Sequence, residues 1–324
     1  MRIPIGDTAL KWIKRAGLAV LLAAIALLVV REAREMDWPA VLSAVREFSW
    51  PQIAAAFALG IPSYLAVASY DLFGRQATGH RLPLPRVALI SYTGYCFSLN
   101  LGALVGGLAF RYRLYSPYGL SAMTIGQIVG LTVITNWSGY VLMAGAVLVY
   151  APPELPAEWG VAGGVMRATG VALLAAAAAY LAACVVKGGE RVVLKGRELR
   201  LPTIGTAALQ VLASTASWAS IGAVVAWLLR DADVSWFAVM PVLMVSAIAG
   251  VWSHVPSALG VTELVFLALL GHLASRSEIL AAILIFRVVY YLVPLGIAIG
   301  CYAYLELTAK RVRGGTRLEP GARS

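Results

Sequence analysis

The residues of this sequence best placed to do chemistry are the few ionisable ones that lie inside apolar stretches. Glu263 and Arg287 both lie in such stretches, where an isolated charge costs at least about 2.5 to 3.5 kcal/mol on insertion scales. We therefore predict that these two side chains pair, either as a structural lock or as a site that holds a headgroup or changes access to it. Asp71 also ends an apolar stretch, but no pattern in the sequence places it beside Glu263.

Arginine and tyrosine alternate in the segment Arg111-Tyr112-Arg113-Leu114-Tyr115. A guanidinium presents a fork of donors that suits phosphate oxygens, and tyrosine suits the interface between lipid and water. The segment therefore predicts a contact with a lipid phosphate, and the alternative is an ordinary positive anchor with an aromatic belt.

The sequence lacks the motifs of common enzymes and metal sites. Its histidines, His80, His254 and His272, do not have metal-ligand spacing, and there is neither a Gly-x-Ser-x-Gly elbow nor a Walker-type loop. We therefore expect no metal, no cofactor and no catalytic residue, in a protein that is not an enzyme. An intramembrane transferase would need two polar side chains, such as Asp71 and Glu263, to converge in one cavity.

The composition indicates which elements must position these residues. Hydrophobic residues make up 60% of the 324 residues and charged residues 13%, with a mean hydropathy of +0.80, whereas a soluble domain carries about 25% charged residues. We predict an all-α integral membrane protein in which each span needs about 20 apolar residues. The predicted spanning helices, about six in number, are 16–30, 51–71, 122–150, 161–186, 204–229 and 279–305.

The basic residues that give the net charge of +10 lie in short loops and at the two ends of the chain. This placement fits a positive-inside topology better than the binding of nucleic acid. Segments 151–160 and 230–236 are acidic on balance and are expected outside. The segments expected in the cytoplasm, which include both termini, are 1–15, 72–86, 187–203 and the basic tail 307–324.

Residue 86 is predicted inside and residue 151 outside, so the chain must cross the membrane an odd number of times between them. Two apolar blocks, 87–110 and 122–150, lie in this interval, so one of them does not cross. The block that does not cross is expected to be the first, because it is rich in glycine and is followed by Arg111 and Arg113. We therefore predict a re-entrant helical hairpin over 87–121. Its breaks are expected at Gly102, Gly106 and Gly107.

A second re-entrant hairpin is predicted over 237–275, broken at Pro256 and Gly260. Two full crossings would satisfy the same charge pattern, so the sequence leaves this alternative open. Residues 1–324 then form a single polytopic domain with candidate half-repeats 10–150 and 161–306. Because the second half would run opposite to the first, the layout is that of an inverted repeat, which in transporters places a site between two broken elements.

Two groups of residues resemble a known membrane family. The first group is Arg86-Val87-Ala88, Gly94-Tyr95-Cys96-Phe97-Ser98-Leu99-Asn100-Leu101-Gly102, Gly106-Gly107, the segment 111–115 and Gly119-Leu120-Ser121. The second group is Val255-Pro256-Ser257-Ala258-Leu259-Gly260-Val261-Thr262-Glu263 and Phe286-Arg287-Val288-Val289-Tyr290-Tyr291-Leu292-Val293-Pro294-Leu295. Together they resemble the transmembrane flippase region of the lysylphosphatidylglycerol synthases, the multiple peptide resistance factor family.

Two departures from the family pattern affect the expectation. A Gly-Gly pair follows the proline in the family, whereas Ser257 and Ala258 stand there in this chain. The full-length synthases continue into a soluble aminoacyl-transferase domain, whereas this sequence ends at Ser324, so we expect a stand-alone flippase-like region.

The resemblance implies a lipid translocase that moves a phospholipid, with aminoacylated lipids among the candidates, across a bacterial-type inner membrane. With this function, the candidate headgroup and translocation residues are Asn100, Arg111, Tyr112, Arg113, Tyr115, Glu263, Arg287, Tyr290 and Tyr291. The alternative is a non-catalytic partner or anchor of a separately encoded lipid-modifying enzyme. The expected partners are membrane phospholipids and such an enzyme, and no nucleic acid is expected. The sequence leaves open whether the protein forms a homo-oligomer. The sequence leaves open whether transport is downhill or coupled to an ion gradient through Glu263.

Overall fold

The structure is a computed structural model that describes residues 37–153, 163–194, 197–253 and 255–316. The predicted first helix, 16–30, lies outside the described residues, as does the end of the basic tail. Among the described residues, six helices are long and apolar enough to cross a membrane. They are α3 (Trp50–Thr78), α6 (Ala122–Tyr150), α7 (Gly163–Lys187), α8 (Ile204–Leu228), α9 (Trp236–Ser253) and a continuous helix made of α11 (Arg276–Phe286), η6 (Arg287–Leu292) and α12 (Val293–Thr316).

These helices confirm the predicted all-α membrane class, and the chain is a multi-pass membrane protein. One difference lies in the basic loop between α7 and α8, where the backbone forms an antiparallel pair of strands. These strands are β1 (Arg191–Leu194) and β2 (Arg197–Arg200). The pairing satisfies backbone hydrogen bonds within the loop.

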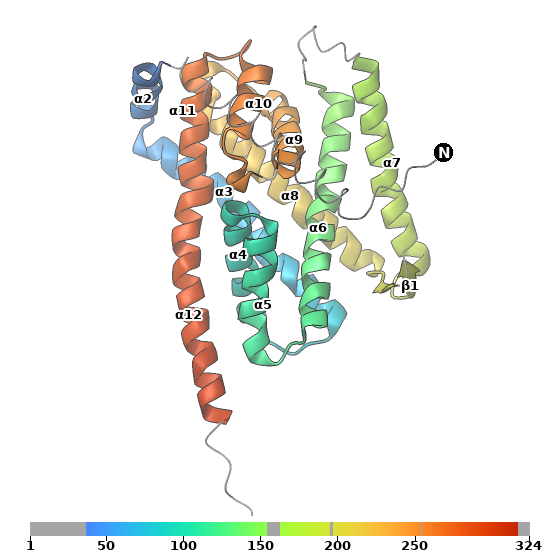
Figure 1. Ribbon diagram of the computed structural model, residues 1–324. Helices are drawn as coiled ribbons and strands as arrows, with labels where there is room; N and C mark the ends of the chain where they lie inside the picture. Colours follow the sequence, from blue (N-terminus) through green and yellow to red (C-terminus); the bar gives the residue numbers. More distant parts are fainter. Residues whose placement is uncertain (1–36, 154–162, 195–196, 254, 317–324) are drawn as a thin grey trace, which may run out of the picture.

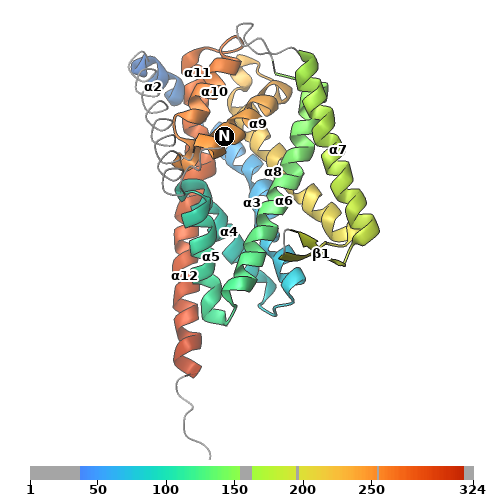
Figure 2. The ribbon, with the colours of Figure 1, turned by 45° about the vertical axis from the view of Figure 1, so that its right-hand side comes forward.

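Two tilted helices, α3 and α8, form the centre of the bundle and run antiparallel to each other (Figure 1). Helices α6 and α7 lie on one side of this pair, and the long α11–α12 helix lies on the other, as Figure 2 also shows. The short helix α2 (Trp38–Glu47) packs beside α11. The central pair therefore contacts both halves of the chain.

Two helical hairpins lie against this frame, one towards each end of the bundle (Figure 1). The first consists of α4 (Leu84–Leu101), the π-helix η1 (Ala103–Ala109), α5 (Phe110–Tyr115) and the 3-10 turn η2 (Ser116–Tyr118). The second consists of α9, the 3-10 turn η5 (Pro256–Ala258) and α10 (Val261–Leu270). That both hairpins are re-entrant, and that the halves 10–150 and 161–306 are inverted repeats, stay predictions.

The length of the second hairpin favours one of the two alternatives that the sequence leaves open. Its return limb, Pro256–Leu270, covers 15 residues, which rise about 22 Å at about 1.5 Å per residue. The hydrocarbon core of a bilayer is about 30 Å thick. The limb is therefore too short for a full crossing, and a hairpin fits segment 237–275 better than two crossings.

Polar caps fix where the long helices begin and end. Ser49 and Gln52 form a capping box at the start of α3, and Ser275 and Glu278 form one at the start of α11. Gly79 ends α3 in the left-handed conformation, with φ of 69°. These caps satisfy backbone groups that the helix itself leaves unpaired.

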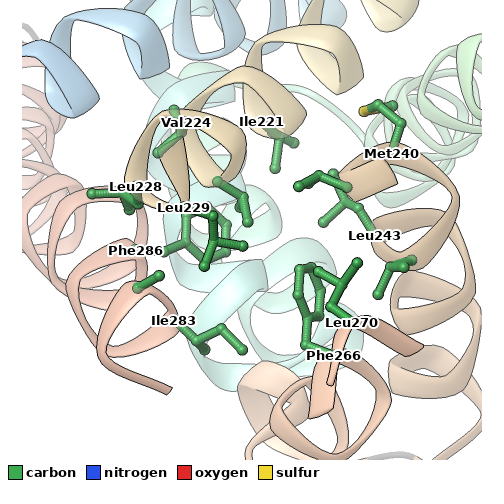
Figure 3. Packing of buried hydrophobic residues seen from close by; sticks show 14 of the residues in the cluster. Ile221, Val224, Leu228, Leu229, Met240, Leu243, Phe266, Leu270, Ile283 and Phe286 are labelled. Atoms are coloured by element: carbon green, nitrogen blue, oxygen red, sulfur yellow. The ribbon is translucent and has the colours of Figure 1, made fainter. Parts of the chain in front are cut away.

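The two hairpins are held by different kinds of contact. Figure 3 shows buried apolar side chains of α8, α9, α10 and α11 meeting in one large cluster around the second hairpin; the labelled residues are Ile221, Val224, Leu228, Leu229, Met240, Leu243, Phe266, Leu270, Ile283 and Phe286. The first hairpin contributes to a smaller buried cluster, which consists of Ile90, Leu114, Tyr115, Ile125, Ile128 and Leu305. Polar contacts therefore matter more for the first hairpin.

The relative sides of the loops agree with the charge pattern. The end of α3, the end of α5 and the β1–β2 loop lie towards one end of the bundle, and the start of α9 lies towards the other (Figure 1). Segments 72–86 and 111–121, which are predicted to share a side, lie at the same end of the bundle because the hairpin turns the chain back. That this end faces the cytoplasm stays a prediction.

We expect cysteine labelling to place both ends of the first hairpin on one side of the membrane. In a background in which Cys96, Cys184 and Cys301 are replaced, single cysteines at Gln76 and Ser116 should react with an impermeant thiol reagent from the same side. A cysteine at Glu47, which is exposed at the opposite end, should react from the other side. Labelling of Ser116 together with Glu47 would contradict the hairpin.

Candidate functional site

The predicted pair of Glu263 and Arg287 is confirmed. Nε of Arg287 lies 2.7 Å from Oε1 of Glu263 and the Nη2 nitrogen lies 3.0 Å from Oε2, so the contact is bidentate. The exposed fractions of the side chains are 11% for Arg287 and 19% for Glu263. The pair joins the return limb of the second hairpin, α10, to the long helix that carries Arg287.

Arg287 also binds the break of the second hairpin. Its guanidinium donates to the carbonyls of Ser257, at 3.0 Å, and Ala258, at 3.4 Å. The backbone there is left-handed, with φ of 56° at Ser257, 49° at Ala258 and 78° at Gly260. Glycine adopts such φ values without steric cost, whereas other residues do not. Ser257 and Ala258 therefore stand at positions whose backbone conformation favours glycine.

Arg111 is buried among α3, α4 and α6, where it pairs with Asp71 of α3. The distances from Nε to the two carboxylate oxygens are 3.1 and 3.0 Å, and the exposed fractions are 3% for Arg111 and 0% for Asp71. The same carboxylate accepts hydrogen bonds from the hydroxyls of Tyr115, at 3.0 Å, and Thr132, at 2.8 Å. Nearly all the acceptor capacity of Asp71 is therefore used.

The remaining nitrogens of Arg111 hold the limbs of the first hairpin together. One donates to the carbonyl of Gly107 at 3.3 Å and the other to the carbonyl of Ser91 at 3.4 Å. Gly94 makes room for the guanidinium, since an added Cβ there would lie 3.0 Å from its central carbon. We refer to the contact of Asp71, Arg111, Tyr115 and Thr132 as the carboxylate lock.

The carboxylate lock corrects the interpretation of the segment 111–115. Helical periodicity turns Arg111 and Tyr115 inward, because residues four apart share a face. Tyr112 and Arg113 point outward with exposed fractions of 49% and 64%, and Arg113 pairs with Glu306 of α12 at 3.1 Å. Arg111 thus has a protein partner and is closed to a lipid phosphate in this arrangement, whereas Tyr112 and Arg113 remain accessible.

The tips of the two hairpins meet within the bundle. The hydroxyl of Ser257 donates to the carbonyl of Asn100 at 3.2 Å, across 157 positions of sequence. The side chain of Asn100 is turned back to its own helix, where its amide donates to the carbonyl of Cys96 at 2.8 Å. The predicted breaks at Gly102 and Pro256 therefore lie next to one another in the fold.

A cluster of buried hydroxyls surrounds Tyr290 at the centre of the bundle. Its hydroxyl lies 2.6 Å from that of Ser63 and 3.2 Å from that of Tyr95, and Ser63 lies 2.8 Å from the hydroxyl of Ser217. Tyr290 is in η6, a π-helical segment, which is a type of distortion often found at functional sites. The neighbouring Tyr291 faces the other way, with its ring 5.6 Å from the guanidinium of Arg287.

A proline explains one further contact of this cluster. Pro294 has no N–H, so the carbonyl of Tyr290, four residues earlier, loses its helical partner. The hydroxyl of Tyr64 on α3 donates to that carbonyl instead. The hydroxyl of Tyr92 on α4 donates to the carbonyl of Pro294 at 3.0 Å. The distorted part of the long helix is thus tied to both α3 and α4.

Sequence reasoning did not identify Asp71 as the partner of Arg111, nor the roles of Ser63, Tyr64 and Tyr95. A signal for the hydroxyl cluster does exist in α8, because Gln210, Ser214, Ser217 and Ser220 recur at helical spacing and are all buried. Polar side chains on one face of an apolar helix indicate a buried contact between helices.

Within the described residues, no group of three or more histidine, cysteine, aspartate or glutamate side chains could hold a metal ion. His80, in the loop between α3 and α4, lies beside Tyr115 with ring centroids 6.0 Å apart. Burial, followed by the nearby positive charge of Arg75, lowers the pKa of His80, and Asp71 opposes the shift. This shift in pKa favours the neutral form of His80.

We predict that the first hairpin depends on glycine at Gly106 and much less at Gly107. A Cβ at Gly106 would overlap the backbone carbonyl of Phe97, whereas one at Gly107 would lie 3.3 Å from the Ser98 hydroxyl. Gly106→Ala should lower the free energy of unfolding by at least about 1 to 3 kcal/mol, because backbone must move. Gly107→Ala is the matched control, with an expected change within about 1 kcal/mol. Thermal unfolding in detergent would measure both, and equal losses would contradict the close packing of the limbs.

Comparisons with known proteins identify the family of this chain. Residues 16–298 match the family model described as the lysylphosphatidylglycerol synthase TM region. The chain is 42% identical over 293 residues to the inner membrane protein YbhN of Escherichia coli (strain K12), covering 90% of this chain and 92% of that protein. It is 29% identical over 287 residues to the uncharacterized protein slr0712 of Synechocystis sp., covering 86% and 88%. With the match extending over both hairpins and over the pairs Asp71–Arg111 and Glu263–Arg287, the chain belongs to the lysylphosphatidylglycerol synthase TM region family and is a multi-pass inner membrane protein.

Proposed function

We propose that this protein is a membrane lipid translocase that moves a phospholipid between the leaflets of the inner membrane. The observation that carries the proposal is the meeting of the two hairpin tips, where Ser257 contacts the backbone of Asn100. Non-helical backbone at membrane depth is tolerated only when it packs in protein or lines a wet cavity. Two such segments in contact offer carbonyls and hydroxyls along which a polar headgroup can pass.

The charges next to the tips support the same proposal. Arg287 is held by Glu263 and by the carbonyls of the second tip. If the second tip moves away from Arg287, this guanidinium loses its backbone partners and becomes available to a phosphate. The pair would then act as a latch that is closed in the structure described here.

At the end of the first hairpin, Tyr112 and Arg113 are the residues that we propose meet the headgroup first. Both are exposed, and the partner of Arg113, Glu306, is itself on the long α12 helix. A phosphate that replaces Glu306 would need to compete only with an exposed ion pair, which contributes little to stability. The family description makes lysylphosphatidylglycerol one candidate cargo beside unmodified phospholipids.

Reconstitution in liposomes tests the proposal. Purified protein is inserted with phosphatidylglycerol, phosphatidylethanolamine or lysylphosphatidylglycerol that carries a fluorescent label, and a membrane-impermeant quencher reports the label that reaches the outer leaflet. We expect exchange well above that of protein-free vesicles for at least one headgroup. Cysteines at Asn100 and Ser257, joined by a reducible bifunctional reagent, should stop exchange, and reduction should restore it. The same reagent applied to the cysteine-free protein is the control.

The absence of exchange for every headgroup, with and without a pH gradient, would contradict a translocase. The alternative, a non-catalytic partner or anchor of a separate lipid-modifying enzyme, would then gain weight. It makes a different prediction, because the protein would co-purify with that enzyme and would change its activity without moving lipid.

A further inference from the structure

A groove with a volume of about 340 Å³ runs between α3, α4 and the long helix at η6 and α12. Its walls include Leu65 of α3, Ala88 of α4 and Ile297 of α12. Of the described residues that line it, none is charged. The groove therefore suits an apolar ligand.

The groove opens on the outer surface of membrane-spanning helices. The exposed fractions of lining residues are 68% for Leu65, 50% for Ile297 and 44% for Ile61. Large apolar side chains with such exposure, on helices that span the membrane, face lipid. An occupant of the groove therefore comes from the hydrocarbon interior of the bilayer.

The polar atoms of the lining tyrosines are turned away from an occupant. The Tyr64 hydroxyl donates to the carbonyl of Tyr290, and the Tyr92 hydroxyl to that of Pro294. The inner wall is consequently aromatic carbon, with the Tyr64 and Tyr92 ring centroids 5.6 Å apart. On its other side, the Tyr64 ring packs against Tyr290 with centroids 5.0 Å apart. A single ring thus separates the groove from the buried hydroxyl cluster.

We propose that this groove binds one acyl chain of a glycerophospholipid and holds it against Tyr64. The volume lies near the lower end of the roughly 300 to 1,000 Å³ usual for ligand sites, which suits a single narrow chain. The groove is continuous with the lipid-facing surface, so a chain can enter sideways while its headgroup stays outside the apolar walls. Only the further step, that the bound lipid is the one transported, rests on the proposed function.

Photochemical crosslinking tests the site. The full-length protein is reconstituted in vesicles of phosphatidylethanolamine and phosphatidylglycerol that contain phosphatidylglycerol with a diazirine on one acyl chain. After illumination, mass spectrometry locates the crosslinked peptides. We expect crosslinks to concentrate on the groove lining of α3, α4 and α12 and to exceed those on the lipid-facing side of α7.

Variants that fill the groove make the test specific. Ala68→Phe and Ala88→Phe place a ring in the groove, and each should lower the groove crosslinks at least about fivefold, because the chain loses its packing contacts. The matched control is Ala172→Phe, at an exposed position of α7, which should leave them unchanged. The two groove variants lie on different helices, and a thermal unfolding curve identifies any variant that fails to fold.

Crosslinks spread evenly over all lipid-facing helices, or unaltered by both groove variants, would mean boundary lipid only and would overturn the proposal. Crosslinks in the groove without lipid exchange would retain the acyl-chain site and would contradict the translocase instead. If the groove variants lose crosslinking and also lose exchange while they remain folded, the bound lipid is the transported one.

Discussion

Replacing Arg111 with methionine is expected to destabilise the protein by about 3 to 5 kcal/mol, because it leaves a buried carboxylate without its counter-ion. Asp71 has an exposed fraction of 0% in the structure and would keep only the hydroxyls of Tyr115 and Thr132. The loss should appear as a lower midpoint in thermal or denaturant unfolding in detergent. Arg111→Ala combined with Arg113→Ala should be destabilised for the same reason, so it does not test phosphate binding alone.

Two comparisons separate this effect from a general loss of charge. Arg113→Met removes an arginine of the same segment that is 64% exposed, and we expect only a small change in the unfolding midpoint, because an exposed ion pair contributes little. Asp71→Asn in the Arg111→Met background should recover part of the lost stability, because the unpaired charge is gone. Equal losses for Arg111→Met and Arg113→Met would contradict the carboxylate lock. A double variant less stable than Arg111→Met alone would also contradict it.

The second large effect is expected at the Glu263 and Arg287 pair. Glu263→Gln or Arg287→Gln alone should leave the other charge in an apolar setting, with a loss of about 3 to 5 kcal/mol at the upper limit for a buried pair. The exposed fractions of 11% and 19% reduce this figure, because water screens part of the charge. The double variant should therefore be more stable than at least one of the single variants.

Lipid exchange in the same variants distinguishes a structural pair from a functional one. If the double variant is stable and still does not exchange lipid, the charges act on the headgroup or on the separation of the tips. If exchange returns together with stability, the pair only holds the fold. Additive losses in a double-mutant cycle would mean that the two side chains are not coupled, despite the 2.7 Å contact.

The distribution of strain and charge gives the two hairpins different characters. The first depends on a close approach at Gly106 and on an internal ion pair, and a small apolar cluster surrounds it. The second carries non-glycine residues in the left-handed conformation and packs into the large apolar cluster. Apolar contacts between helices gain little from the hydrophobic effect in lipid, so hydrogen bonds and ion pairs help to fix the geometry of both hairpins.

The sequence by itself determined the features that the bilayer or the local backbone imposes. Long apolar blocks predict spanning helices because unpaired backbone groups cannot face lipid, and basic loops predict which segments share a side. Glycine and proline mark the breaks at Gly102 and Pro256 because few other residues allow them. The pairing of Glu263 with Arg287 could be predicted because both charges lie in apolar sequence near one another along the chain.

Only the tertiary structure decided how each helix is rotated and which distant residues it meets. Asp71 and Arg111 lie 40 positions apart, and the contact between Asn100 and Ser257 spans 157. The sequence around Arg111 looks the same whether its guanidinium faces a lipid phosphate or a buried carboxylate, and the choice depends on packing among α3, α4 and α6. The hydroxyl cluster around Tyr290 needs four helices in register, α3, α4, α8 and the long helix that carries Tyr290. Such contacts follow from the shape of the assembled bundle, which local propensity and charge placement do not encode.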